Sequence, residues 1–63
     1  MNYLITLNNE RAFIIKEKMS LDELQTLIEN NKSLIFNTLD SFGNSSEKVL
    51  IVCDKINMIE ERK

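Results

Sequence analysis

The chain contains no histidine, no proline and no tryptophan, and only one glycine and one cysteine among its 63 residues. A single cysteine excludes a disulfide within the chain, and without histidine a structural zinc site lacks its usual ligands. Cys53 also has no imidazole to activate it as a nucleophile, so we interpret it as a small core residue. The one glycine, Gly43, rules out a glycine-rich phosphate loop. These absences predict no catalytic residue, no metal site and no cofactor.

Charge of one sign and long hydrophobic stretches are lacking too. The formal net charge is −2, and the eight basic residues are scattered, which argues against nucleic acid as a partner because its affinity comes largely from neutralised phosphates. The longest apolar run, Val49 to Cys53, is far shorter than the ~20 residues that cross a bilayer. Glu10 and Arg11 interrupt the N-terminal segment before any sustained apolar core, so we expect no cleavable signal. The expectation is a soluble cytoplasmic protein without a membrane partner.

The residues that are abundant indicate a folded globule. The composition is 43% hydrophobic and 29% charged, unlike that of a disordered tail. Asn, Ile, Lys and Glu are frequent, a usage common in proteins from AT-rich genomes, including low-GC bacteria and their phages. A chain of this length makes one domain, residues 1–63, and buries only ~60% of its unfolded surface.

The N-terminal half reads as a hairpin followed by a helix. Residues 3–7 alternate as a strand, Asn8-Asn9-Glu10 is a polar turn in which Asn would take the left-handed backbone, and residues 11–17 return as a strand. Ser20 and Glu23 match a capping box, which predicts a helix over residues 21–31 with Asn30-Asn31 as a left-handed stop.

The C-terminal half reads as strands. We predict a strand from Ser33 to about Asp40, a loop over residues 41–47 and an apolar strand from Lys48 to Cys53. Residues 54–63 fit either a helix or a strand, and we favour a strand because Asn57 is a poor helix former and the strand upstream needs a neighbour.

These elements predict an α+β fold with the order β-β-α-β-β(-β). Two hairpins joined by a helix give either an open antiparallel sheet with one helix packed on it or a small SH3-like barrel. The sequence leaves both arrangements open.

Three apolar runs point to association. Phe13–Ile15, Leu34–Phe36 and Val49–Cys53 are apolar on consecutive residues, so an extended backbone puts apolar groups on both faces of the sheet. One helix shields one face, and an uncovered apolar face of several hundred Å² is rare on a stable monomer. We therefore predict a dimer or higher oligomer of the chain.

Four side chains are candidates for the interface. Tyr3 is an aromatic residue near the N-terminus, and Phe42 stands alone in a polar loop, where it either folds back onto the core or anchors a partner. Ile56 and the adaptable Met58 would share one face of a terminal strand.

The function that these features favour is a small non-enzymatic, homo-oligomeric interaction protein that binds another macromolecule. The partner that we expect is another protein, and a phage-encoded inhibitor of a host protein is one form of this hypothesis, because such inhibitors are commonly short, acidic and free of catalytic motifs. The alternatives are a small nucleic-acid-binding barrel and an oligomer that sequesters a small ligand such as a nucleotide.

Overall fold

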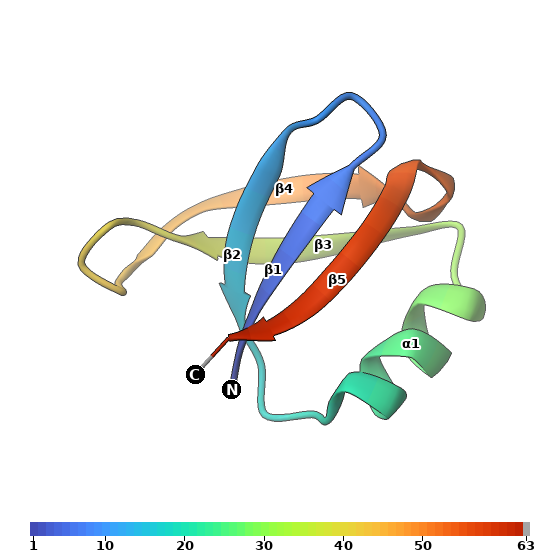
Figure 1. Cartoon of the computed structure of the whole chain (residues 1–63), viewed down its shortest axis with the longest axis horizontal. Coiled ribbons are helices and arrows are strands. Elements are labelled where there is room, and N and C mark those ends of the chain that lie inside the picture. The colour runs from blue at the N-terminus through green and yellow to red at the C-terminus, as the bar shows by residue number, and fades with distance from the viewer. Residues whose placement is uncertain (63) are drawn as a thin grey trace.

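The structure, a computed structural model, describes residues 1–62 and contains five strands and one α-helix (Figure 1). The elements in chain order are β1 (Asn2–Leu7), β2 (Ala12–Lys16), α1 (Leu21–Glu29), β3 (Ser33–Leu39), β4 (Ser45–Val52), a 3-10 turn (Cys53–Lys55) and β5 (Ile56–Arg62). All strand pairs are antiparallel, and the order across the sheet is β4-β3-β2-β1-β5. The predicted antiparallel sheet with one helix is confirmed, and so is the fifth strand; Lys63, the last residue of that prediction, lies outside the described residues.

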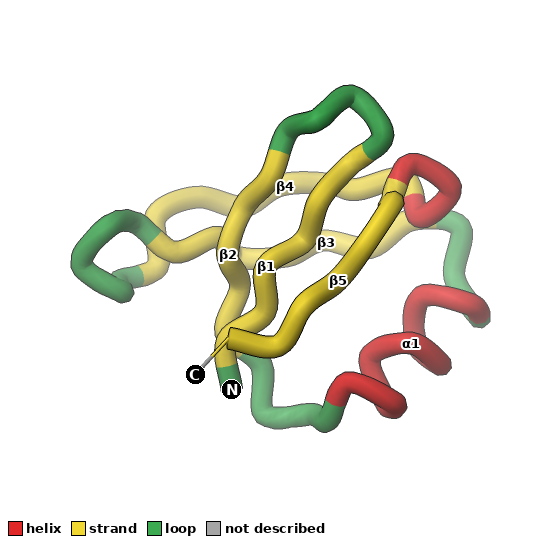
Figure 2. Tube along the Cα trace, in the orientation of Figure 1, coloured by secondary structure: helices red, strands yellow, loops and turns green. Residues whose placement is uncertain are grey.

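The sheet is bent into two crossing groups of strands. Figure 2 shows β1, β2 and β5 aligned along roughly one axis, with β3 and β4 crossing behind them. Between β2 and β3 the ladder is short, with Ile15 paired opposite Thr38. Because the sheet folds over at this narrow joint, the inner faces of the two groups share one core.

The core takes one or two side chains from nearly every element. Tyr3, Ile5, Ile15 and Leu24 are fully buried, and Phe36 and Ile51 are nearly so. Leu24 is the one residue of α1 in this set, and half-buried Leu27 and Ile28 pack beside it. The helix therefore covers only part of the inner surface, and strands facing strands supply the rest.

The helix begins where the sequence predicts and ends earlier. The Ser20 hydroxyl accepts a hydrogen bond from the Glu23 backbone N–H at 3.2 Å, and the Glu23 carboxylate accepts one from the Ser20 N–H at 3.2 Å, so the capping box is confirmed. The C-cap is Asn30 with φ −93°, so the predicted left-handed stop at this residue is wrong. The last turn is instead closed by the Asn31 side chain, which donates to the Leu27 carbonyl at 2.7 Å.

The two hairpin turns share one geometry. Leu7 N–H donates to the Arg11 carbonyl at 2.8 Å and Glu10 N–H donates to the Leu7 carbonyl at 3.0 Å. In the second hairpin, Asp40 N–H donates to the Asn44 carbonyl at 2.9 Å and Gly43 N–H donates to the Asp40 carbonyl at 3.1 Å. Each loop has three residues, and the third takes a left-handed backbone, as is usual for this hairpin class.

Different residues occupy that left-handed position in the two turns. Gly43 has φ +82° and Glu10 has φ +69°. The sequence assigned the left-handed backbone of the first turn to asparagine. This is wrong, because the loop geometry requires the left-handed conformation at its third residue, Glu10. A residue with a Cβ atom pays about 1–2 kcal/mol in this conformation.

We expect Glu10→Gly to raise the free energy of unfolding by about 0.5–1 kcal/mol, since glycine relieves the strain but has more freedom to lose on folding. Urea denaturation measures the change. Glu10→Ala is the matched control, because it removes the charge and keeps the strained backbone, and it should give no gain. Equal stability of the Glu10→Gly and Glu10→Ala variants would contradict this account of the turn.

Gly43→Ala should lower the free energy of unfolding by about 1 kcal/mol from backbone strain alone, since nothing lies within 4 Å of the added Cβ.

Candidate interaction surface

The β3–β4 hairpin has apolar side chains on both faces. In its register Phe36 lies opposite Val49 on the inner face, and Ile35 lies opposite Leu50 on the outer face. Ile35 is 68% exposed and Leu50 is 65% exposed, while Val52, further along the outer face of β4, is 48% exposed. We call Ile35, Leu50 and Val52 the outer patch. Two of the apolar runs thus place side chains on a face that residues 1–62 leave largely exposed.

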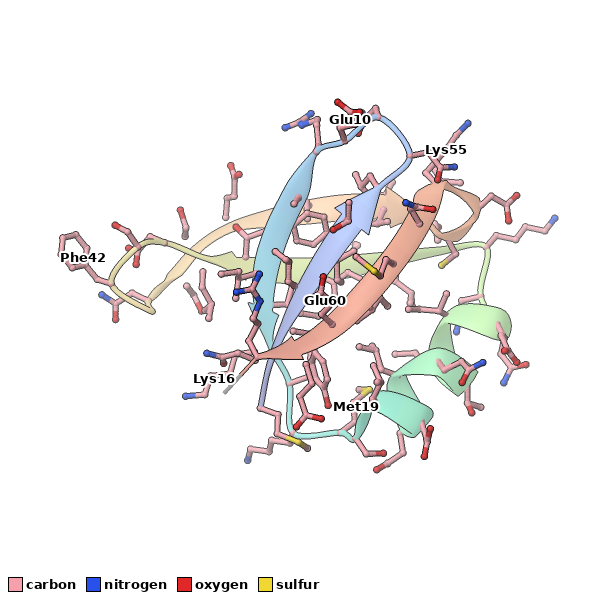
Figure 3. All side chains as sticks on the ribbon, viewed as in Figure 1. Glu10, Lys16, Met19, Phe42, Lys55 and Glu60 are labelled. Atoms are coloured by element: carbon pink, nitrogen blue, oxygen red, sulfur yellow. The ribbon has the colours of Figure 1, made fainter. Side chains whose placement is uncertain are left out.

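Phe42 lies at the tip of the same hairpin and points into solvent. Its side chain is 86% exposed, and Figure 3 shows it projecting from the tip of the β3–β4 loop. The Asp40 carboxylate accepts hydrogen bonds from the backbone N–H of Phe42 at 2.8 Å and of Asn44 at 3.0 Å. Of the two alternatives for Phe42, the structure has the exposed one. The turn holds the backbone that carries the ring, so less conformational entropy is lost if the ring enters a pocket.

Ile56 and Met58 lie on opposite faces of β5, so the prediction that they share a face is wrong. The β1–β5 ladder shifts register between Thr6 and Leu7, placing Met58 opposite Thr6 and Ile56 opposite Leu7. A bulge of this kind adds one residue and reverses the facing of everything before it. Ile56 consequently packs against the core, whereas Met58 remains 48% exposed.

Tyr3 is a core residue, which corrects its prediction as an interface candidate. Its side chain is fully buried, and its hydroxyl donates to the Met19 backbone carbonyl at 2.6 Å. Burial raises the pKa of the Tyr3 phenol, and the carboxylates of Glu61 and Glu23 raise it further. The alternation of residues 3–7 was read correctly as a strand, but alternation alone does not tell which face turns inward.

An open groove separates the β1–β2 hairpin from β4. It has a volume of about 750 Å³ and lies beside half-buried Phe13 and Val49, with the Leu50 side chain at its border. A second hollow of about 500 Å³ continues it along the last residues of β4, where Asn8 and Asn9 form the opposite wall. Both hollows are present because no helix lies over β4.

The residues with reactive side chains do not converge. Cys53 is half-buried in the 3-10 turn; burial raises the pKa of its thiol, and the neighbouring Asp54 raises it further, which disfavours the reactive thiolate. Within residues 1–62, no three side chains of Cys, Asp or Glu are placed to hold a metal ion together. In the same range, no helix has the length and apolar content needed to span a membrane.

The comparisons with known proteins return nothing: no protein-family model, no curated protein and no solved structure matches this chain. Any functional argument therefore depends on the surface itself.

Sequence reasoning missed the residues that form the outer patch. Ile35, Leu50 and Val52 all belong to the apolar runs, so the signal was present in the sequence. Their outward facing depends on the hairpin register, which the sequence did not define. Of the four predicted candidates, Phe42 and Met58 are exposed, whereas Tyr3 and Ile56 pack into the core.

We expect Phe42→Ala to change the free energy of unfolding by less than about 0.5 kcal/mol, because an exposed ring contributes no burial. Phe36→Ala is the matched control: the same truncation at a nearly buried site should cost about 3–5 kcal/mol. Chemical denaturation of the two variants measures both effects. A loss above about 1 kcal/mol for Phe42→Ala would mean that the ring packs on the protein in solution.

Proposed function

We propose that this chain is a non-enzymatic interaction protein that associates with itself and acts by binding another protein. The observation that carries the proposal is the outer patch, three aliphatic side chains exposed on one face of β3 and of its neighbour β4, which forms the edge of the sheet. Exposed apolar groups gathered on one face are typical of interaction sites. Phe42 adds a second contact element, since aromatic rings are frequent anchors in protein interfaces.

The size of the outer patch bounds the strength of association. Fully burying a Val, Leu or Ile side chain is worth about 1.5–3 kcal/mol, so three partly exposed side chains on each of two copies give roughly 5–11 kcal/mol. Association costs about 4–15 kcal/mol in lost freedom of motion. The patch alone therefore supports a weak dimer, and a tight one needs further interactions at the same surface.

The proposal extends to the architecture. The strand order, the crossing of β3–β4 behind the other strands and the short turn before β5 support a small SH3-like barrel that is incompletely closed. The groove beside β4 is then the gap in the barrel wall. The cytoplasm as its location, and an origin as a phage-encoded inhibitor of a host protein, remain parts of the proposal that rest on composition alone.

A nucleic-acid-binding barrel is the second candidate, and one feature favours it. Lys16 and Arg62 flank Asn2 in a row across the outer face, two strand spacings or about 10 Å apart. Glu60 lies in the next row, opposite Leu4, and the net charge is −2. The acidic neighbour weakens attraction to phosphates, so we rank this candidate second. An electrophoretic shift with mixed DNA and RNA at low salt distinguishes nucleic-acid binding from protein binding.

We expect light scattering at about 10 μM and above to give at least twice the 7.4 kDa mass of the chain. The melting temperature should rise with protein concentration, because association stabilises the folded state by mass action. A 7.4 kDa species at every concentration, with a constant melting temperature, would contradict the self-association.

A further inference from the structure

The backbone of β4 alternates between bonding to β3 and facing the free edge. Cys53 N–H donates to the Lys32 carbonyl at 2.8 Å, and the β3–β4 register continues this pairing without a shift from Ser33 opposite Val52. In an antiparallel ladder, hydrogen-bonded pairs alternate with pairs whose backbone groups point outward. The N–H and C=O groups of Lys48, Leu50 and Val52 therefore point away from β3.

This edge of the sheet lies away from α1 (Figure 1). The order of strands ends at β5 on one side, where α1 lies nearby (Figure 1) and Leu21, Ile28 and Ile56 border one hollow of about 480 Å³. It ends at β4 on the other side, where the hollow between Val52 and Asn9 leaves open space. Free edges attract other strands, and proteins usually shield them with charge, proline or a covering element.

We propose that a second copy of the chain pairs with this edge, its β4 antiparallel to the first about a two-fold axis at Leu50. Leu50 then lies opposite the partner's Leu50, and Lys48 lies opposite the partner's Val52. Each of these pairs exchanges both backbone hydrogen bonds. The inference rests on the proposed self-association and names the surface and the register.

The side chains favour this register over its neighbours. Because Ile35 lies beside Leu50, the joint sheet has an unbroken outer row of four aliphatic side chains, two from each copy. A register centred on Lys48 would set two ammonium groups against each other, and one centred on Val49 would place Lys48 beside the partner's Leu50. Centring on Ile51 loses pairs, because β4 ends at Val52.

The same β4–β4 contact also pairs side chains on the inner face. Val49, which is only half-buried, comes to lie opposite the partner's Ile51, so the interface extends the core of each copy along the groove. Two-fold contacts of this kind close on themselves and yield a dimer, not a filament.

The register is tested by a pair of variants at one exposed position. Val52→Glu places a carboxylate opposite the partner's Lys48, and Val52→Lys places a like charge there; both lose the same aliphatic group. We expect the dissociation constant of the dimer, measured by analytical ultracentrifugation, to be about tenfold higher for Val52→Lys, since two cross-strand pairs change sign per dimer. Circular dichroism checks that both variants fold.

A third variant tests the edge itself. Leu50→Pro removes an N–H that points away from β3, so it should abolish the dimer and leave the fold intact, whereas Leu50→Val keeps the N–H and should remain dimeric. If Leu50→Pro does not fold, the Val52 pair decides.

Each outcome is decisive. A dimer that treats the two Val52 variants alike, or that survives Leu50→Pro, would overturn the β4 pairing while self-association through another surface stands. A wild-type chain that is monomeric at all concentrations would overturn both.

Discussion

The pairing of β1 on both edges, with one face buried, is the constraint on which the rest of the structure depends. This strand pairs with β2 on one edge and β5 on the other, and it supplies Tyr3 and Ile5, two of the fully buried side chains. The Tyr3 hydroxyl fixes the segment before the helix by its bond to the Met19 carbonyl. The nine-residue helix covers part of the inner face, and β3 and β4 cross over the rest.

In this arrangement β4 is an edge strand of the sheet. Its inner side chains Val49 and Ile51 are needed by the core, so the strand must be apolar, and its outer face then presents Leu50 and Val52 to solvent. No proline or covering helix protects its free edge. The feature that supports an interaction function thus arises because a small chain with one short helix must use both faces of β4, and Phe42 is a separate exposed ring at the tip of the same hairpin.

Local signals predicted the elements well, and long-range geometry limited the prediction of the site. The capping box at Ser20 and the strand alternation act within a few residues, so they could be read directly. The bulge opposite Thr6 and Leu7, which turns Met58 away from Ile56, depends on how two distant strands meet. The inward facing of Tyr3 likewise required knowing which side the other strands cover. Self-association was inferred from the two-faced runs, but the residues of the outer patch needed the register of β3 against β4.

The central claim is that the free edge of β4 pairs with β4 of a second copy. The most direct test is hydrogen exchange at the backbone amides of β4. In dilute solution Lys48, Leu50 and Val52 should exchange quickly, while Val49 and Ile51, bonded to β3, should be protected. In concentrated solution the first three should become protected as the edge is paired. If these three amides exchange at the same rate at every concentration, or are already protected in dilute solution, the edge is not the interface and the account is wrong.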